Sequence, residues 1–400
     1  MKFRFTTLIF VAILVFYIVS CGKTMPLAPE ENQLLDGQIE GLSIEQQIQF
    51  LQGDIAFNDD VFTVDKGLGP IFNAISCVSC HAGDGKGHPF TRFTRFGQTD
   101  TISGNQFLSL GGPQLQNKAI PGFMPEQLPL STTSSDLIAP AVSGLGYLDA
   151  VSDESLIAMS DPNDEDGDGI SGRPHWNNIP DYVQLRPNSI SQNGRYISRF
   201  GKKGAAYDLL HQTAEAYNQD IGIASLFEPI DTYSRLEIDP EISTQTLHNV
   251  AFYLKTLKAP LSRDEGDTDV IAGEDIFSQI NCASCHMPVL HTGYSPIEVL
   301  SHKEIYPFTD LLLHDMGAEL DDNYTEGYAL TSEWKTPALW GLGLSKNSQG
   351  GSYFLMHDGR ATSIEEAIML HGGEAGQSKT NYTQLSETEK LQLIKFLESL

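Results

Sequence analysis

Hydrophobic residues recur with helical spacing in several parts of the chain. In residues 243–257 the side chains of Leu247, Val250 and Leu254 fall on one face, which predicts an amphipathic helix. Similar patterns predict helices over 204–218, from Ser363 towards His371, and over 386–400. Strand patterns are sparse, and residues 97–193 are rich in Gly, Pro, Ser and Asp, which predicts loops with short helices. We therefore expect a mainly α protein.

Two shorter segments, 67–75 and 273–281, also read as helices, and each leads into the pentapeptide Cys-x-x-Cys-His. Phe72 and Phe277 each stand five residues before the first cysteine of their pentapeptide. The repeated pattern resembles two cytochrome c-type domains, in which such a helix packs an aromatic ring against the haem edge. The expected fold is therefore two cytochrome c-type haem domains with long loop-rich insertions.

The two pentapeptides have the spacing that covalent attachment of c-type haem requires. In such a site the two thiols form thioethers with the porphyrin, and the adjacent histidine ligates the iron. The residues concerned are Cys77, Cys80, His81, Cys282, Cys285 and His286. The sequence therefore predicts two covalently bound haems, with His81 and His286 as iron ligands.

Thiol–disulfide chemistry and zinc binding are the alternatives for a Cys-x-x-Cys pair. Neither of them needs a histidine directly after the second cysteine in both copies. The chain has five cysteines, four of them in the pentapeptides, so haem attachment leaves no pair for a structural disulfide.

The fifth cysteine, Cys21, follows a segment that reads as an export signal. Residues 1–20 begin with the basic side chains of Lys2 and Arg4 and continue as an uncharged apolar stretch, which is short for a membrane span. The residues around Cys21 resemble the lipobox of bacterial lipoproteins, which predicts a lipid-anchored, extracytoplasmic protein of the cell envelope that faces the periplasm or lies at the cell surface. The alternative is an ordinary signal peptide with an incidental cysteine.

The remaining chain divides into three expected parts. Residues 21–45 lack hydrophobic periodicity and read as a tether, 46–260 as the N-terminal haem domain and 261–400 as the C-terminal haem domain. The formal net charge of −27 argues against a nucleic-acid partner. An acidic surface serves solubility, or it steers a cationic electron donor.

Several motifs resemble the di-haem oxidoreductase family of peroxidase-like proteins, which is related to bacterial di-haem cytochrome c peroxidases and MauG-type enzymes. The resemblance covers nearly all of the chain beyond the tether. Its motifs lie at 80–87, 114–116, 166–173, 199–201, 313–317, 333–341, 356–361 and 365–375. It implies an oxidoreductase in which hydrogen peroxide or dioxygen reacts at the N-terminal haem. Electrons from an unidentified donor or substrate are then relayed through the C-terminal haem.

The family resemblance also implies a second iron ligand for the C-terminal haem. The relatives have a methionine in a position that here falls on His371, which implies ligation by two histidines and a lower haem potential. Met316, Met356 and Met369 are rival ligands, and His371 could instead be an ordinary polar residue at a helix end.

For the N-terminal haem, the relatives place a Gln and, ten residues later, a Glu in the distal pocket, and Gln116 and Glu126 have this separation. A carboxylate there can move a proton between the oxygens of peroxide, which heterolytic cleavage requires. The alternative for Glu126 is a solvated loop acid. The relatives also have a Trp between the haems, near the position of Gln106 and Phe107 here. This chain has its tryptophans at Trp176, Trp334 and Trp340 instead.

Four further candidates have weaker signals. His88 and His314 are possible displaceable ligands of the first haem, although His88 reads as a surface residue. Arg360 is a candidate partner for a haem propionate, with a surface salt bridge as the alternative. The acidic residues Asp164, Asp166 and Asp168 resemble the start of an EF-hand calcium loop. His175 stands where that loop has a bidentate Glu, so a plain acidic turn is the alternative to calcium.

Two classes of function remain open from these residues. One is a peroxidase-like enzyme with an exchangeable site at the first haem, and the other is an electron-transfer cytochrome with both irons six-coordinate. An oxygenase that acts on an organic substrate is a further possibility. Thiol–disulfide oxidoreductase activity is excluded if both cysteine pairs are bound to haem, because no thiol pair then remains to react.

Overall fold

The computed structural model describes residues 30–98 and 113–400. Its contacts divide the chain into two units, Met1–Leu34 and a folded body, Leu35–Leu400. The predicted signal peptide, Cys21, Gln106 and Phe107 lie outside the described residues. No helix in the described part of the chain is long and apolar enough to cross a membrane.

Helices exceed strands in the folded body, and much of the remainder is loop, as predicted. The α-helices are α2 (Ile44–Asp54), α3 (Leu145–Ala150), α4 (Asp153–Met159), α5 (Leu209–Ile221), α6 (Thr244–Thr256), α7 (Thr268–Gln279), α8 (Ser345–Ser348), α9 (Ile364–Leu370), α10 (Gly376–Gln384) and α11 (Glu387–Ser399). The first turns of the two pentapeptides are the 3₁₀-helices η4 (Cys77–Ser79) and η7 (Cys282–Ser284).

The strands are short, and all their pairings are antiparallel. The two-stranded sheets are β1 (Ile71–Phe72) with β3 (Lys118–Ala119), β2 (Phe93–Phe96) with β4 (Ser134–Leu137), β8 (Leu290–His291) with β9 (Glu304–Ile305), and β10 (Leu313–Asp315) with β11 (Glu333–Lys335). A three-stranded sheet has the order β5 (His175–Asn177), β7 (Arg195–Ser198) and β6 (Ser191–Gln192).

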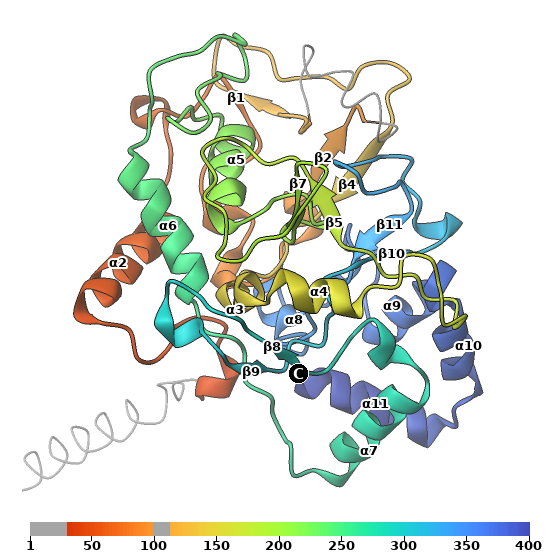
Figure 1. The fold of residues 1–400 in the computed structure, drawn as a ribbon. Coiled ribbons are helices and arrows are strands. Elements are labelled where there is room, and N and C mark those ends of the chain that lie inside the picture. Colours follow the sequence, from red (N-terminus) through yellow and green to blue (C-terminus); the bar gives the residue numbers. More distant parts are fainter. Residues whose placement is uncertain (1–29, 99–112) are drawn as a thin grey trace, which may run out of the picture. The chain divides into compact units, whose positions relative to one another are not determined.

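Two closely packed helix pairs, α2 with α6 and α7 with α11, lie in different parts of the folded body (Figure 1). Each pair crosses at a glycine. A Cβ atom on Gly53 would lie 2.1 Å from the carbonyl oxygen of Asn249, and one on Gly273 would lie 2.1 Å from that of Gln392. Because these distances are far below van der Waals contact, only glycine allows the two backbones to approach this closely.

Aromatic residues pack in a similar way beside each crossing. The ring centres of Phe50 and Tyr253 are 5.0 Å apart, and those of Phe277 and Phe396 are 5.5 Å apart. One hydrophobic core joins α2, α5 and α6, with Cys77 packed against it, and another joins α7, α9 and α11. Each pentapeptide thus lies beside its own helix pair, while the domain boundaries at 46–260 and 261–400 stay a prediction.

The helix predicted over 67–75 is wrong. This segment contains the strand β1, paired with β3, whereas the equivalent segment 273–281 is largely the end of α7, as expected. Gly67 has a φ of 82°, which interrupts a right-handed helix. A Cβ on Gly69 would lie 2.0 Å from the carbonyl oxygen of Gly222, so a tertiary contact holds this segment extended.

The other helices form close to the predicted positions because side chains cap them. Ser243 accepts a hydrogen bond from the backbone N–H of Thr246 and begins α6, and Ser363 caps α9 in the same way. The helix expected from 204 begins later, at α5, because the Asp208 side chain caps it there.

The folded body also begins earlier than expected. Leu35, Ile39 and Leu42 are buried, and the backbone N–H of Ile39 donates to the carbonyl of Thr256 at 2.8 Å. The part of the predicted tether from Leu35 onwards is therefore packed structure.

Candidate functional site

A continuous cavity of about 430 Å³ lies in the folded body, and both pentapeptides line it. The first contributes Cys77, Cys80 and His81 from η4 and the residue that follows it, and the second contributes Cys282, Cys285 and His286 from η7. The structure therefore brings together two motifs that are some 200 residues apart in the sequence. The lining is rich in apolar side chains, as a large hydrophobic cofactor requires.

The four cysteines of the pentapeptides are not joined by disulfides. Burial raises the pKa of Cys77, Cys80 and Cys282 to about 12, and it also raises the pKa of Cys285. Redox-active Cys-x-x-Cys pairs instead need a lowered thiol pKa, because the thiolate is the reactive form. The surroundings of these thiols therefore argue against thiol–disulfide chemistry.

Beside the second pentapeptide, two imidazole rings have one nitrogen fixed and the other free. The Nδ1 atom of His286 lies 3.1 Å from the carbonyl oxygen of Phe308, and that of His371 lies 2.7 Å from the carbonyl oxygen of Ala367. A carbonyl can only accept, so both Nδ1 atoms carry the proton and both Nε2 atoms are left as potential metal ligands.

The separation of these two rings fits a shared iron. Their centres are 6.4 Å apart, and two imidazoles bound to opposite faces of one metal at about 2 Å hold their centres about 6 Å apart. Burial lowers the pKa of His286 to about 4 and also lowers that of His371, which keeps both rings in the neutral form that binds metal. By contrast, the rival Met369 is 43% exposed.

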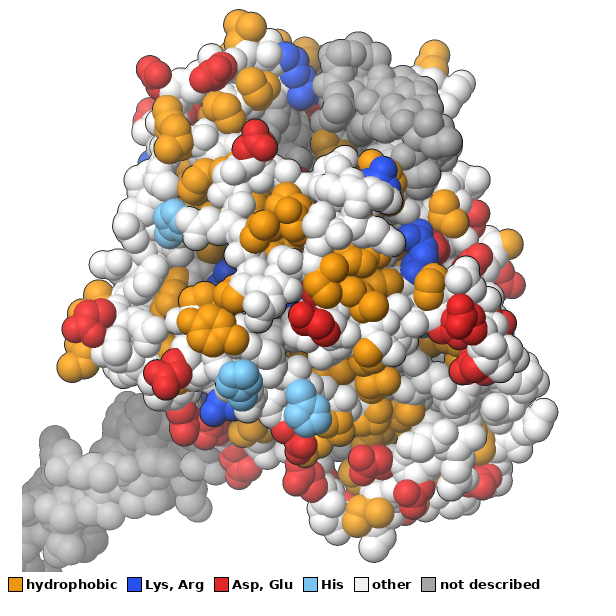
Figure 2. All heavy atoms as spheres, in the orientation of Figure 1, with side chains coloured by type: hydrophobic (Ala, Val, Ile, Leu, Met, Phe, Trp, Pro, Cys, Tyr) orange, Lys and Arg blue, Asp and Glu red, His pale blue; other side chains and the backbone are white. Residues whose placement is uncertain are grey.

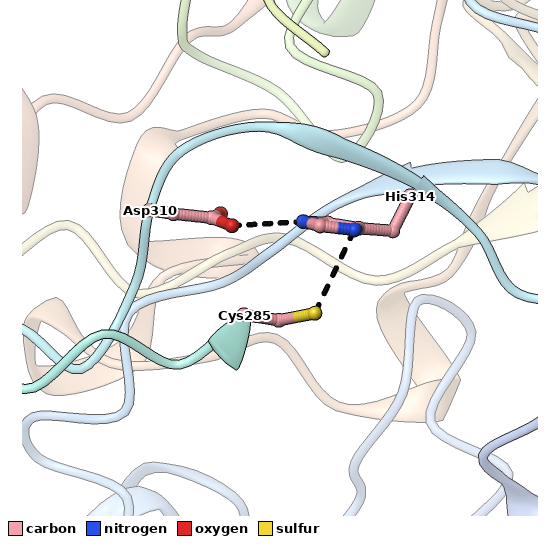
Figure 3. A group of neighbouring side chains, drawn as sticks. All are labelled: Cys285, Asp310 and His314. Carbon is pink, nitrogen blue, oxygen red and sulfur yellow. Dashed lines mark hydrogen bonds and ion pairs between the residues drawn. The ribbon is translucent and has the colours of Figure 1, made fainter. Parts of the chain in front are cut away.

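His314 lies beside the second pentapeptide rather than the first, with Cys285 and Asp310 around it (Figure 3). Its Nε2 lies 2.8 Å from Asp310 Oδ2, and its Nδ1 lies 2.6 Å from Glu374 Oε2 and 3.6 Å from Cys285 Sγ. Although burial favours the neutral ring, hydrogen bonds to these three side chains raise the pKa of His314 to about 12. Both ring nitrogens of His314 are hydrogen-bonded to carboxylates beside the second pentapeptide, so neither is free for the first haem. The ligand atoms of Cys285, Asp310 and His314 all lie within 4.8 Å of one another, which is close enough to share a metal ion.

The first pentapeptide has a different histidine environment. The ring of His81 lies 5.7 Å from that of Phe57, and its Nδ1 has no hydrogen-bond partner in the described part of the chain. Burial lowers the pKa of His81 to about 4. No second histidine ring faces it among residues 30–98 and 113–400, in contrast to His286.

The structure places Gln116 and Glu126 together, directly behind the cavity lining, which includes Gln219 but neither of these two residues. Glu126 pairs with Arg235 at 2.7 Å, and its other oxygen accepts from the backbone N–H of Gln116 at 2.8 Å. Burial raises the pKa of Glu126 against the opposing effects of these partners. The side-chain amide of Gln116 donates to the carbonyl of Gln219 at 2.9 Å.

A carboxyl that does line the cavity near the first pentapeptide is Asp220, at the end of α5. Burial raises its pKa, and its charge contributes to the raised pKa of Cys77 and Cys80, which places it close to both thiols. The side-chain amide of Gln114 donates to Asp220. No sequence motif marks Asp220, although its partner Gln114 lies in the Gln-Leu-Gln motif that contains Gln116.

His88 and Arg360 lie outside the cavity lining. The Nδ1 of His88 accepts from the backbone N–H of Phe90 at 3.1 Å. Arg360 is exposed, and its Nε lies 2.7 Å from Asp358 Oδ2. This is the surface salt bridge that the sequence analysis gave as the alternative to a propionate partner.

The acidic turn contains a cluster formed by Asp161, Asp164 and Asp166, with Asp161 in place of Asp168. The Asp168 carboxylate instead accepts from the backbone N–H of Ile170 at 2.8 Å, and that of Asp164 accepts from the N–H of Gly169 at 3.0 Å. Calcium binding at this turn stays a prediction.

Two tryptophans, Trp334 and Trp340, line the cavity, whereas Trp176 on β5 does not. Trp334 stacks on His357 with ring centres 3.8 Å apart. His357 Nε2 lies 3.0 Å from Asp322 Oδ2, so this ring is also engaged. Aromatic rings thus border the space shared by the two pentapeptides.

Residues 136–400 match the family described as "Di-haem oxidoreductase, putative peroxidase". The chain belongs to this family. The match includes the second pentapeptide and His371, while the first pentapeptide precedes it. Membership in the di-haem oxidoreductase family supports haem as the cofactor and oxidoreduction as the activity of this cavity.

Two solved structures are similar to this di-haem oxidoreductase at low sequence identity. Hydrazine synthase from Kuenenia stuttgartiensis has 14% identity and a TM-score of 0.40, with 94% of each chain covered. A MauG-like protein associated with microbial copper homeostasis has 14% identity and a TM-score of 0.34, with 65% of this chain and 89% of that chain covered. No curated protein matches the sequence.

Proposed function

We propose that this chain is a peroxidase-like di-haem c-type oxidoreductase. Hydrogen peroxide or dioxygen reacts at the haem held by Cys77 and Cys80, and electrons pass through the haem held by Cys282 and Cys285. The observation that carries this proposal is an asymmetry in one cavity: His371 stands opposite His286, whereas no second histidine in the described residues faces His81.

A haem iron with one open axial position supplies the binding and reduction of peroxide or dioxygen. His81 would hold the iron of that haem, while His286 and His371 would together hold the iron of the other haem. We assign the proton transfer that the sequence analysis gave to Glu126 to Asp220, because Asp220 lines the cavity and burial raises its pKa. A raised pKa makes a carboxyl a stronger base than a free carboxylate, which suits a group that accepts a proton and then returns it.

An electron-transfer cytochrome is the alternative, and one observation favours it. Met316 and Met356 line the same cavity, and a methionine thioether is a common haem ligand. If either side chain bound the first iron, that site would be closed to peroxide.

The proposal places the mature protein outside the cytoplasm. Attachment of c-type haem takes place there in bacteria, and the apolar segment before Cys21 provides a route for export. Lipidation of Cys21 would hold the folded body at a membrane surface and close to an envelope electron donor.

Absorption and EPR spectra of the purified, haem-loaded protein test the proposal in the ferric, reduced and peroxide-treated states. We expect one high-spin and one low-spin ferric haem, with peroxide changing the high-spin signal. Two low-spin haems that do not respond to peroxide would identify an electron carrier, and an absence of covalent haem would overturn both functions.

A further inference from the structure

Four lysines line the cavity: Lys379 on α10, near His371, and three others that come from separate segments. Lys86 follows the first pentapeptide, Lys202 follows β7, and Lys335 ends β11. None of the three forms an ion pair with a described residue. The Nζ of Lys335 reaches only the carbonyl of Thr336, at 3.5 Å.

This arrangement is costly in a protein with so many acidic residues. The chain has 52 acidic and 25 basic side chains, and acidic side chains outnumber basic ones on the face shown in Figure 2. Burial lowers the pKa of Lys86 and Lys335 to about 8 and, with the charges of these two neighbours, that of Lys202 to about 7. The carboxylates that line the same cavity bond other side chains: Glu326 bonds Arg95, Glu215 bonds His211, Glu374 bonds His314 and Asp220 bonds Gln114. An anion that entered the cavity would therefore stabilise the charged form of the three lysines.

The neighbouring Lys203 shows how a buried lysine is satisfied without an added anion. Its Nζ donates to the carbonyls of Leu330, Thr331 and Glu333 at 3.0, 2.9 and 2.7 Å. Among residues 30–98 and 113–400, the Nζ of Lys202 has no hydrogen bond or ion pair, although Lys202 is adjacent in the sequence and the charge of Asp358 acts on it. We attribute the difference between the two lysines to the cavity, because Lys202 lines it and Lys203 does not.

The three lysines also connect the two pentapeptides. The charge of Lys202 lowers the pKa of His81, which places it near the first motif. Lys335 is influenced by Asp310, the partner of His314 beside Cys285. Lys202 interacts electrostatically with both Lys86 and Lys335, so the cluster extends from one haem space to the other.

We propose that Lys86, Lys202 and Lys335 bind the haem propionates where the two haem spaces meet. Each haem brings two carboxylates, which supply the anions that the cluster needs. This inference rests on the proposed di-haem function, and it assigns to these lysines the role that the sequence analysis gave to Arg360. Cations at this place favour the reduced haems, because reduction adds negative charge.

The test compares the haem-loaded variants K86Q, K202Q and K335Q with K66Q, which alters an exposed lysine outside the cavity. Resonance Raman spectra report hydrogen bonding at the propionates through their bending bands, and spectroelectrochemistry reports the potentials. We expect shifted bands in the three cavity variants but not in K66Q. We also expect the equilibrium constant for reduction of at least one haem to fall roughly tenfold.

The conservative variant K202R keeps the cation and should restore the potential. If a Gln variant does not mature, the corresponding Arg variant is measured, since a guanidinium still changes the propionate bands. Unchanged bands in haem-loaded variants at all three positions would overturn the inference and leave the proposed function standing. Absence of covalent haem in the unmodified protein would instead overturn the proposed function.

Discussion

The imidazole rings of His286 and His371 face each other with their centres 6.4 Å apart. One ring follows the second pentapeptide, and the other belongs to the residue that ends α9. Backbone carbonyls hold the Nδ1 atom of each ring, which leaves both Nε2 atoms free. Two neutral rings held in this way are suited to bind one iron from opposite sides.

Replacing His371 should therefore change the second haem alone. We expect H371M to raise its potential, since methionine ligation favours the reduced iron, and H371A to convert a low-spin ferric signal to high-spin. EPR and a redox titration measure both effects, with H88A as a control outside the cavity lining. A low-spin signal that survives in H371A would show that another residue is the ligand.

Replacing the cysteines of one pentapeptide by serine should remove one haem and leave the other. C77S/C80S should retain only the haem of the second pentapeptide, and C282S/C285S only that of the first, because the thioethers need the thiols. Pyridine haemochrome assays and intact mass measure the haem content. An unchanged ratio of haem to protein in either variant would contradict covalent attachment at that motif.

Asp220 and Glu126 can be compared directly as proton carriers. We expect D220N to slow the peroxide reaction at the first haem by about 10²-fold or more, because Asp220 lines the cavity. E126Q should affect the rate much less, since Glu126 pairs with Arg235 at 2.7 Å. Stopped-flow absorption measures the two rates, and a large loss in E126Q with normal D220N would return the role to Glu126.

His314 should affect stability in a defined pH range. Its pKa is raised from 6.5 to about 12 in the folded protein, so its stabilising effect is complete below pH 6.5 and is lost as pH rises towards 12. The destabilisation by H314Q should therefore be larger at pH 6 than at pH 9.5, by up to about 1.4 kcal/mol per pH unit. Urea unfolding at the two pH values tests this, and an equal deficit at both would argue that His314 is neutral.

Gly53 and Gly273, the two glycines at which the helix pairs cross, should not tolerate a side chain. We expect G53A and G273A to lower the free energy of unfolding by roughly 1–3 kcal/mol, because the added Cβ would lie 2.1 Å from a carbonyl oxygen. G376A is the matched control, since no atom lies within 4 Å of its added Cβ. Thermal and urea unfolding compare the three, and a stable G273A would mean that α7 and α11 can separate without cost.

The local sequence was sufficient to predict those features of the fold that depend on residues close together in the chain. The caps at Ser243 and Ser363 and the apolar faces of α6 and α11 were predictable because they depend on residues three or four positions apart. The Cys-x-x-Cys-His pentapeptides are likewise local. The helix expected over 67–75 fails because its conformation depends on Gly222, a residue far along the chain.

The sequence by itself thus determined the two motifs and predicted the helices α5, α6, α7, α9 and α11. Through a family resemblance it also singled out His371 as a candidate ligand. Only the tertiary structure decided that both motifs line one cavity and that Glu126 pairs with Arg235 while Asp220 reaches the lining. It also decided that Lys202 lines this cavity without an ion pair to any residue that the structure describes. The physical reason is that burial and charge pairing depend on segments brought together by packing, and no local pattern encodes which distant side chain fills the space opposite.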